Sequence, residues 1–379
     1  MGPRPPPLES LKRFWPEIGG LDPPTHPPPL KEEGPSAGGS PGTHRKAYYH
    51  PAYFGRSMAN LNVAILGPQG YAKEVGKKGT STDITFYNLK RGESTVTIVE
   101  PTRYPERLAP LFFAASLAKK AVLVVDAIDA AFGEGVIMLQ ALGIREGYII
   151  LRNYLDPGRV NPVIKGTVLA EYEQIDDDPI ALRERLLDEA DKLQEATPSP
   201  EERGGAIPVD HFFNVRGIGT VVLGTMAEGV IRKHETLRVL PGDRTAQVRS
   251  IQKHDDDFDW ARAGDRAGIA LKNIEADELD RGDVLASDEA LRSESSLSAR
   301  AELIRYWPAP LKEGMVLHIG HWMQFLPARV ASVEAGEDWR RPLLKLELEK
   351  PLVYRPGDRA VICPLEGSKL RIAGILELP

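Results

Sequence analysis

The sequence lacks the features of a secreted or membrane-spanning protein. It has one cysteine, Cys363, so no internal disulfide can form, and we expect this residue to be a small apolar side chain in a strand. The longest apolar runs stop well short of the roughly 18 residues that a membrane-spanning helix needs. The amino terminus also lacks the apolar core of a signal peptide. These absences predict a cytoplasmic protein without membrane segments.

A basic excess is missing as well. The formal net charge is -6 at pH 7, whereas a protein that wraps a nucleic acid with its whole surface needs positive charge. The hydrophobic content of 42% is ordinary for a globular protein of 379 residues, a length that allows about two to four domains. The composition excludes a whole-surface binder of polyanions and leaves a local basic patch open.

The first 57 residues differ in composition from the rest of the chain. They hold 13 of the 32 prolines and little apolar material, which predicts a disordered, proline-rich tail over residues 1–57. Met58 stands just before the first convincing strand. The tail is therefore interpreted either as an upstream extension of the reading frame or as a proline-rich motif for a partner.

Residues 58–200 alternate apolar strands with helical stretches, a pattern typical of an α/β domain with a largely parallel sheet covered on both faces. Strands are expected over residues 61–67, 82–89, 95–100, 121–127, 147–153 and 168–175. Helices are expected over residues 105–118, 134–142 and 179–193. The last helix should bury Ile180, Leu182, Leu186, Leu187 and Leu193. The aspartates at 176–178 should cap its N-terminus.

The remainder of the chain changes to short alternating strands separated by Gly and Asp turns. This pattern predicts two small antiparallel β-barrels, one over residues 205–290 and one over residues 291–379. The predicted order is one α/β domain followed by two barrels.

The first strand runs into a turn that resembles a phosphate-binding loop. In the pattern GxxxxGK[ST], glycines let amides surround the phosphates, while the lysine contacts the terminal phosphates and the hydroxyl binds magnesium. Gly67 and Lys73 occupy the first glycine and the lysine. Ala72 stands at the second glycine and Glu74 at the hydroxyl, where a carboxylate would repel phosphate. The motif alone is weak evidence for nucleotide binding.

A phosphate-binding loop is normally followed by a helix of several turns, whose N-terminus stabilises the phosphates. Here Gly76 and Gly79 interrupt the segment almost at once. We expect one or two helical turns at most.

The predicted barrels carry a more specific signal. Residues 217–225 read GIGTVVLGT, and the segment AGDRAGIALK follows from Ala263. Both resemble the second domain of translational elongation factors of the EF-Tu and SelB kind, and residues 348–362 resemble their third domain. The resemblance covers roughly residues 60–379, is strongest over 206–287 and is nearest to SelB-like archaeal proteins. It implies a P-loop-type α/β domain followed by two antiparallel barrels.

The resemblance also allows the GTP-binding elements of that family to be located. Its D-x-P-G-H motif corresponds to residues 100–104, where Glu100 stands for the magnesium-linked aspartate. Arg103 replaces the glycine whose amide meets the γ-phosphate, and Tyr104 replaces the histidine that positions the attacking water. The threonine of the first switch would fall near Thr82, far too close to the loop, which indicates that the switch has been deleted.

The family's guanine-reading motif N-K-x-D corresponds to NYLD. Asn153 and Asp156 are in place, but Tyr154 stands where a lysine should stack on the base. Because catalysis of phosphoryl transfer depends on positioning and electrostatics, the combined losses predict a pseudo-GTPase. Weak binding of GTP or GDP through Lys73, Asn153 and Asp156 stays open.

The resemblance implies partners in translation, namely the ribosome, a tRNA or another translation factor. In the family the second domain holds the aminoacyl end of tRNA, so Arg216, Arg232 and Lys233 are candidate RNA contacts, with ordinary barrel-surface charges as the alternative. The rival hypotheses are a working GTPase that delivers a special tRNA and a regulatory protein that docks on a genuine elongation factor.

Other chemistry finds little support in the sequence. His318 and His321 are three apart on an expected strand, so their side chains should point to opposite faces, and we expect structural roles. The acidic residues between 255 and 259 lack the glycine and the distal glutamate of a calcium loop and are interpreted as a barrel loop. Trp260, Trp307, Trp322 and Trp339 are expected in the barrel cores or rims. No metal site is predicted.

Overall fold

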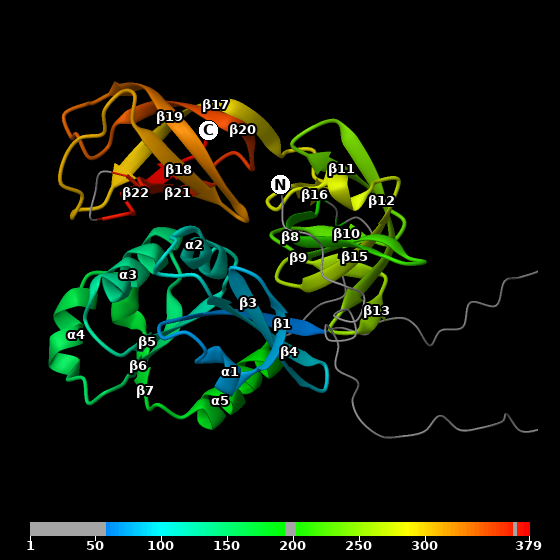
Figure 1. Cartoon of the computed structure of the whole chain (residues 1–379), viewed down its shortest axis with the longest axis horizontal. Helices are drawn as coiled ribbons and strands as arrows, with labels where there is room; N and C mark the ends of the chain where they lie inside the picture. Colours follow the sequence, from blue (N-terminus) through cyan, green and yellow to red (C-terminus); the bar gives the residue numbers. More distant parts are fainter. Residues whose placement is uncertain (1–57, 194–201, 203, 367–369) are drawn as a thin grey trace, which may run out of the picture. The chain divides into compact units, whose positions relative to one another are not determined.

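The computed structural model describes residues 58–193, 202, 204–366 and 370–379 (Figure 1). The expected tail over residues 1–57 lies outside the described residues, as do residues 194–201 and 203, near the expected boundary between the α/β domain and the first barrel. The described residues form an α/β domain, a first barrel and a second barrel, in that order along the chain.

The α/β domain contains a mixed seven-stranded sheet in the order β2-β3-β4-β1-β5-β6-β7. Its parallel part comprises β4, β1, β5, β6 and β7, while β3 pairs antiparallel with both β2 and β4. The strands are β1 Ala59–Leu66, β2 Lys77–Ser81, β3 Ile84–Arg91, β4 Ser94–Pro101, β5 Lys120–Val125, β6 Glu146–Leu151 and β7 Glu173–Ile175. The predicted largely parallel sheet is confirmed, with an antiparallel edge.

Helices cover both faces of this sheet (Figure 1). In β1, Val63 and Ile65 pack on the side of α1 and α5, whereas Ala64 and Leu66 pack on the side of α2 and α3. This alternation explains why the strand is apolar throughout. The helices are α1 Ala72–Val75, α2 Ala109–Ala115, α3 Ala130–Leu142, α4 Pro157–Ile164, the 3-10 helix η3 Val168–Glu171, and α5 Pro179–Lys192.

Three expectations for the α/β domain were wrong in detail. Residues 168–171 form η3 rather than strand, because the Thr167 hydroxyl accepts a hydrogen bond from the Leu169 amide and starts a helical turn. Helix α4 was not predicted. In α5, Leu182, Leu186 and Leu187 are buried as predicted, but Ile180, in the first turn, is 70% exposed. Leu193, just after the end of the helix, is only partly buried.

The first barrel is an antiparallel sheet in the order β11-β16-β8-β9-β15-β12-β13, closed by pairing of β11 with β12. Its interior is filled by alternate residues of the strands, such as Val222 and Ile269. The strands are β8 Ala206–Val215, β9 Gly219–Thr225, β11 Thr236–Leu240, β12 Arg244–Lys253, β13 Asp256–Phe258, β15 Arg266–Lys272 and β16 Val284–Ala286. Two further strands, β10 Val230–Arg232 and β14 Trp260–Arg262, pair with each other, and η4 spans Ala276–Glu278.

The second barrel is closed in the order β17-β20-β19-β18-β21-β22. Its strands are β17 Arg292–Leu303, β18 Val316–His321, β19 Gln324–Glu334, β20 Leu343–Tyr354, β21 Arg359–Cys363 and β22 Gly374–Glu377. Cys363 is fully buried in β21, as predicted. The fold therefore matches the architecture expected from the sequence, an α/β domain followed by two antiparallel barrels.

No helix in the described part of the chain is both long and apolar enough to cross a membrane.

Candidate functional site

The turn that resembles a phosphate-binding loop, residues 67–73, connects β1 to α1. Gly67 has a φ of +146°, and a Cβ atom at this position would lie 2.3 Å from the Val124 carbonyl oxygen of β5. Only glycine allows the loop to approach the neighbouring strand so closely. Helix α1 contains four residues and ends at Gly76, after which the chain enters β2. The expectation of at most one or two helical turns is confirmed.

The Glu100 carboxylate accepts hydrogen bonds from two backbone amides of this loop. The backbone amides of Gly70 and Ala72 donate hydrogen bonds to Glu100 Oε1 at 2.9 and 3.2 Å. The other oxygen, Oε2, accepts a hydrogen bond from the Tyr87 hydroxyl at 3.1 Å. Burial and the adjacent Glu100 carboxylate raise the pKa of Tyr87, so the phenol remains a donor. Glu100 itself is only 5% exposed.

This arrangement follows from strand order. Strands β1 and β4 are parallel neighbours, with Ala64 opposite Val99, so their carboxyl ends meet at one edge of the sheet. Glu100 therefore lies beside the loop that leaves β1. In a nucleotide-binding loop the corresponding amides donate hydrogen bonds to phosphate oxygens. A carboxylate is also a strong hydrogen-bond acceptor, so it can take the place of these oxygens.

Lys73 and Glu74, which occupy the lysine and hydroxyl positions of the motif, are both exposed. Among the described residues, the Lys73 side chain has no ion-pair partner. The backbone carbonyl oxygens of Glu74 and Val75 accept hydrogen bonds from the Arg183 guanidinium of α5, at 3.1 and 2.6 Å. The C-terminal end of α1 is thus bound to α5.

A second group of side chains connects the loop to the end of β6. The Tyr71 hydroxyl donates to Asp177 at 3.0 Å, and Arg152 forms an ion pair with the same carboxylate at 3.0 Å. The Arg152 guanidinium also lies over the Tyr71 ring, 5.9 Å from its centroid. Arg152 contacts Asp126 at the end of β5 as well, at 3.5 Å. Nothing in the local sequence pattern indicated this network.

The residues at the guanine-reading positions lie in the loop between β6 and α4. Asn153 and Tyr154 have φ angles of +54° and +56°, and the Tyr154 side chain is fully exposed. Asp156 caps α4, where it accepts a hydrogen bond from the Gly158 amide at 2.8 Å. The Asn153 side chain donates to the Asp126 carbonyl at 3.4 Å. Both polar side chains therefore have partners within the chain.

Tyr104, at the position of the water-positioning histidine, is 8% exposed and points into the α/β domain. Its hydroxyl donates hydrogen bonds to the Ala131 carbonyl at 2.8 Å and to Glu134 at 3.0 Å, both in α3. Burial, reinforced by Glu134, raises its pKa. Arg103 is exposed. The Tyr104 hydroxyl is therefore engaged by helix α3.

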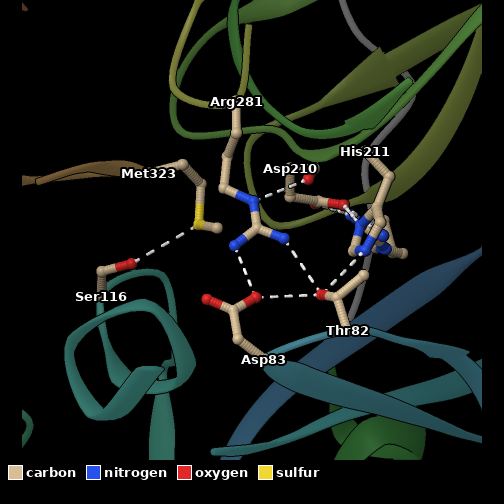
Figure 2. A network of polar contacts seen from close by, with 8 residues as sticks. Thr82, Asp83, Ser116, Asp210, His211, Arg281 and Met323 are labelled. Atoms are coloured by element: carbon tan, nitrogen blue, oxygen red, sulfur yellow. Dashed lines mark hydrogen bonds and ion pairs between the residues drawn. The ribbon is translucent and has the colours of Figure 1, made fainter. Parts of the chain in front are cut away.

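Thr82, expected near the switch threonine, lies in the turn between β2 and β3 and contacts the first barrel (Figure 2). Its hydroxyl accepts a hydrogen bond from Arg281 at 3.0 Å and lies 3.3 Å from the His211 ring. Arg281 also pairs with the neighbouring Asp83, at 2.6 Å. Sequence reasoning missed Arg281, since its partners lie about 200 positions away.

The three candidate RNA contacts differ in whether their side chains already interact with other residues of the chain. Arg216 is exposed in the turn between β8 and β9. Arg232 donates to the Glu202 carbonyl at 2.6 Å, and Lys233 lies 3.9 Å from Asp259. Arg216 is therefore the most available of the three.

The other polar clusters have structural roles. His318 stacks on Phe325 at 5.3 Å, whereas His321 contacts the Val353 carbonyl at 3.0 Å and Asp358 at 3.1 Å, so the two rings lie on opposite faces of β18, as predicted. The acidic segment was expected to be a loop, but β13 begins at Asp256, which pairs with Lys90 of β3. Within the described ranges, no group of three His, Cys, Asp or Glu residues could hold a metal ion.

The four tryptophans considered above are packed rather than exposed, as predicted. Trp307 is 5% exposed inside the second barrel, and Trp260 lies beneath the Lys253 ammonium, 3.9 Å from its ring centroid. Trp322 and Trp339 are half-buried.

Comparison with known proteins gives consistent similarities. Residues 219–286 match the family described as elongation factor Tu domain 2. An uncharacterized protein of Methanocaldococcus jannaschii is 37% identical over 324 residues, which cover 85% of this chain and 100% of the relative. The selenocysteine-specific elongation factor of the same organism is 26% identical over 341 residues, covering 81% of this chain and 72% of that protein.

Solved structures show the same fold. The apo form of translation elongation factor SelB from Methanococcus maripaludis has a TM-score of 0.70 and 22% sequence identity, and the match covers 85% of this chain and 79% of that one. The same factor in complex with the GTP analogue GppNHp also gives a TM-score of 0.70.

Proposed function

Because the chain belongs to the EF-Tu/SelB-like family of translational GTPases, we propose that it acts in translation as a binding protein whose α/β domain no longer hydrolyses GTP. The family supports a role in translation. The loss of GTPase activity is inferred from the chain's own residues.

The single observation that carries this proposal is the position of Glu100. Its carboxylate accepts hydrogen bonds from the Gly70 and Ala72 amides, the groups that would have to receive the phosphates. A triphosphate would have to displace a buried carboxylate, and a carboxylate that stayed close would repel it. Since Tyr87 also holds the second oxygen, displacing Glu100 breaks three hydrogen bonds.

The remaining catalytic positions support the same proposal. Chemistry on the γ-phosphate needs a positioned water and a mobile switch that closes over the nucleotide. The Tyr104 hydroxyl donates a hydrogen bond to Glu134 of α3. Helix α1 is followed directly by β2, so the chain has no segment there that is long enough for a mobile switch. The Asp156 carboxylate caps α4, where it accepts a hydrogen bond from the Gly158 amide. Any residual contact with GTP or GDP through Lys73 and Asn153 is therefore weak.

We infer partners from the family and from the barrels. A ribosome, a tRNA or another translation factor fits a protein that retains both elongation-factor barrels, and it would act in the cytoplasm. Arg216 is the first candidate for an RNA contact, followed by Arg232 and Lys233. Without a functional switch, binding does not depend on the state of a nucleotide, and release requires another event.

Calorimetric titration tests the nucleotide part of the proposal. We expect no heat of binding for GTP or GDP with Mg²⁺, no hydrolysis, and no effect of Lys73→Ala. Glu100→Ala frees the two loop amides, so this variant, unlike the wild type, should acquire measurable affinity for GDP. Glu100→Gln is the matched control, because it removes the charge and keeps one acceptor oxygen for the loop amides, although an NH₂ donor replaces the second oxygen. Tight, magnesium-dependent GTP binding with turnover by the wild type would overturn the proposal.

Sedimentation with ribosomes tests the translation part. The tagged full chain is sedimented with ribosomes in the presence of GTP, GDP or no nucleotide, and we expect equal recovery in all three. Co-purification from extract with and without ribonuclease then separates an RNA partner from a protein partner. Recovery that requires GTP would instead support the second candidate, a working GTPase that delivers a special tRNA, as the names of the selenocysteine-specific relatives suggest.

A further inference from the structure

The α/β domain and the second barrel share one hydrophobic core. Along β21, Val361 and Cys363 pack with α2 and α3, whereas Ala360 and Ile362 pack inside the barrel. Val361 and Cys363 are at most 1% exposed. These residues of β21 are apolar on both faces of the strand. Separating the two domains would therefore expose apolar side chains to water.

Aromatic rings extend this shared core. Phe112 and Phe113 of α2 lie 5.6 and 6.2 Å from Phe325 of β19, measured between ring centroids. Gly320 of β18 makes room for Phe112, because a Cβ atom there would lie 2.7 Å from a carbon of the Phe112 ring. The close approach shows that the two surfaces are shaped for each other.

A buried ion pair crosses the same junction. Arg371 of the second barrel binds Glu134 of α3 with two hydrogen bonds of 2.7 and 2.5 Å, and the Glu134 side chain is 7% exposed. Tyr104 donates a third hydrogen bond to this carboxylate. Opening the junction would leave a carboxylate and a guanidinium without their partners, which is costly in a buried position.

Arg281 joins the first barrel to the α/β domain (Figure 2). Its guanidinium donates to Asp83 at 2.6 Å, to the Thr82 hydroxyl at 3.0 Å and to the Asp210 carbonyl at 3.1 Å. It also lies 5.5 Å from the centroid of the Phe113 ring in α2. One side chain therefore contacts the β2–β3 turn, strand β8 and the helix that packs on the second barrel.

We propose that these contacts hold the α/β domain and both barrels in one arrangement whether or not a guanine nucleotide is present, and that Arg281 is the positioning residue of the first barrel. The inference extends the proposed function, because it assigns a fixed conformation to a chain that lacks a switch. The turn at residues 82–83, where the family would place a mobile threonine, serves here as a fixed interdomain contact.

Cys363 is a natural reporter for the junction with the second barrel, since it is the chain's single cysteine and is buried there. Its alkylation by iodoacetamide is followed in the full chain without nucleotide, with GDP and Mg²⁺, and with a GTP analogue and Mg²⁺. We expect rates equal within about twofold in the three states and at least about 100-fold slower than in urea. Acceleration by either nucleotide would overturn the proposal.

Variants test the individual contacts. Arg371→Gln should accelerate alkylation of Cys363 on the order of tenfold. Arg359→Gln, an exposed position on the same strand as Cys363, should leave the rate within about twofold of the wild type. For the first barrel, hydrogen exchange is measured in the peptide that contains residues 78–90. Arg281→Gln should speed exchange there, and Arg216→Gln should not. Arg281→Lys should give an intermediate rate of exchange, because a lysine ammonium group keeps the positive charge but cannot reproduce the planar arrangement of donors in the guanidinium group. Unchanged exchange in Arg281→Gln would remove Arg281 from its assigned role.

The two proposals can fail separately. If calorimetry detects GTP binding while the alkylation rate stays constant, the loss of nucleotide binding is wrong and the fixed arrangement stands. If no nucleotide binds but Cys363 reacts as fast as in urea, the fixed arrangement is wrong and the proposed function stands.

Discussion

Gly67 has a role in the α/β domain that does not require a bound phosphate. Its backbone lies so close to β5 that an added Cβ atom would meet the Val124 carbonyl oxygen at 2.3 Å, and its φ is +146°. We expect Gly67→Ala to lower the free energy of unfolding by about 1–3 kcal/mol, because the loop must shift and adopt a strained conformation. Urea denaturation in nucleotide-free buffer measures this change.

Gly133 supplies the matched control for this substitution. It lies within α3, and a Cβ atom there would have no neighbour within 4 Å. Gly133→Ala should therefore keep or raise the stability by up to about 1 kcal/mol. If Gly67→Ala were equally harmless, the glycine would not be needed for packing, and a ligand would be the better reason for its presence.

Glu100 shows why one residue of the site could be located from the sequence while its role could not. The resemblance placed an acidic residue at the end of β4, and the structure has it there. Its hydrogen bonds depend on Gly70 and Ala72, which lie 30 and 28 residues earlier and are brought close by the parallel pairing of β1 with β4. Tyr87 comes from the antiparallel neighbour β3 and could not be inferred from any local pattern.

At the scale of single elements, helix α5 depends on one capping side chain. Asp178 Oδ1 accepts hydrogen bonds from the Ile180 and Ala181 amides, at 2.9 and 3.0 Å. We expect Asp178→Ala to destabilise the protein by about 1 kcal/mol in thermal or urea unfolding, since two amides lose their acceptor. Asp178→Asn should retain most of the stability, because asparagine also caps helices well.

Asp176 is the control for this cap. It is exposed two residues earlier in the same acidic run and belongs to no ion pair in the part of the chain that the structure describes. Asp176→Ala should change the stability by less than about 0.5 kcal/mol. Equal losses in Asp176→Ala and Asp178→Ala would point to a general effect of negative charge near the helix N-terminus rather than to the cap.

Elements with strong apolar patterns were predictable, and those formed through distant contacts were not. The buried strands β5 and β6, helix α5 and most barrel strands follow from their own residues. Strand β2 is largely polar, and pairing with β3 gives it its conformation. Likewise β22 has four residues and forms between β17 and β21. Tertiary pairing decides such segments, so a local pattern carries little information about them.

At the scale of the whole molecule, the junction between the α/β domain and the first barrel contains carboxylates whose pKa values are lowered by arginines. Burial alone would raise the pKa of Asp83, but the charge and hydrogen bonds of Arg281 outweigh it and lower the pKa below its usual range. Burial would likewise raise the pKa of Asp210, which Arg266 and His211 lower. Both groups lie where the β2–β3 turn meets the first barrel (Figure 2). The junction is therefore sensitive to acid.

The sign of this effect determines the last prediction. A carboxyl group whose pKa is lowered by folding stabilises the protein above the pKa of the unfolded chain, about 3.9, and the stabilisation is lost as the pH falls through the lower folded pKa. Asp83→Asn removes the charge at every pH. The variant should be about 1–3 kcal/mol less stable than the wild type at pH 7 in urea unfolding followed by tryptophan fluorescence.

The difference between the two proteins should then shrink as the pH approaches 3, because the wild-type carboxyl group becomes neutral as well. Asp176→Asn, at an exposed position, should match the wild type at both pH values. A constant difference across this range would mean that Asp83 acts through its shape and hydrogen bonds alone. Equal stability at pH 7 would mean that the Arg281 contact contributes nothing net, as many exposed ion pairs do. We expect the stability difference between the wild type and Asp83→Asn to decrease gradually as the pH falls. This result requires that the charge of Asp83 itself stabilise the contact between the α/β domain and the first barrel.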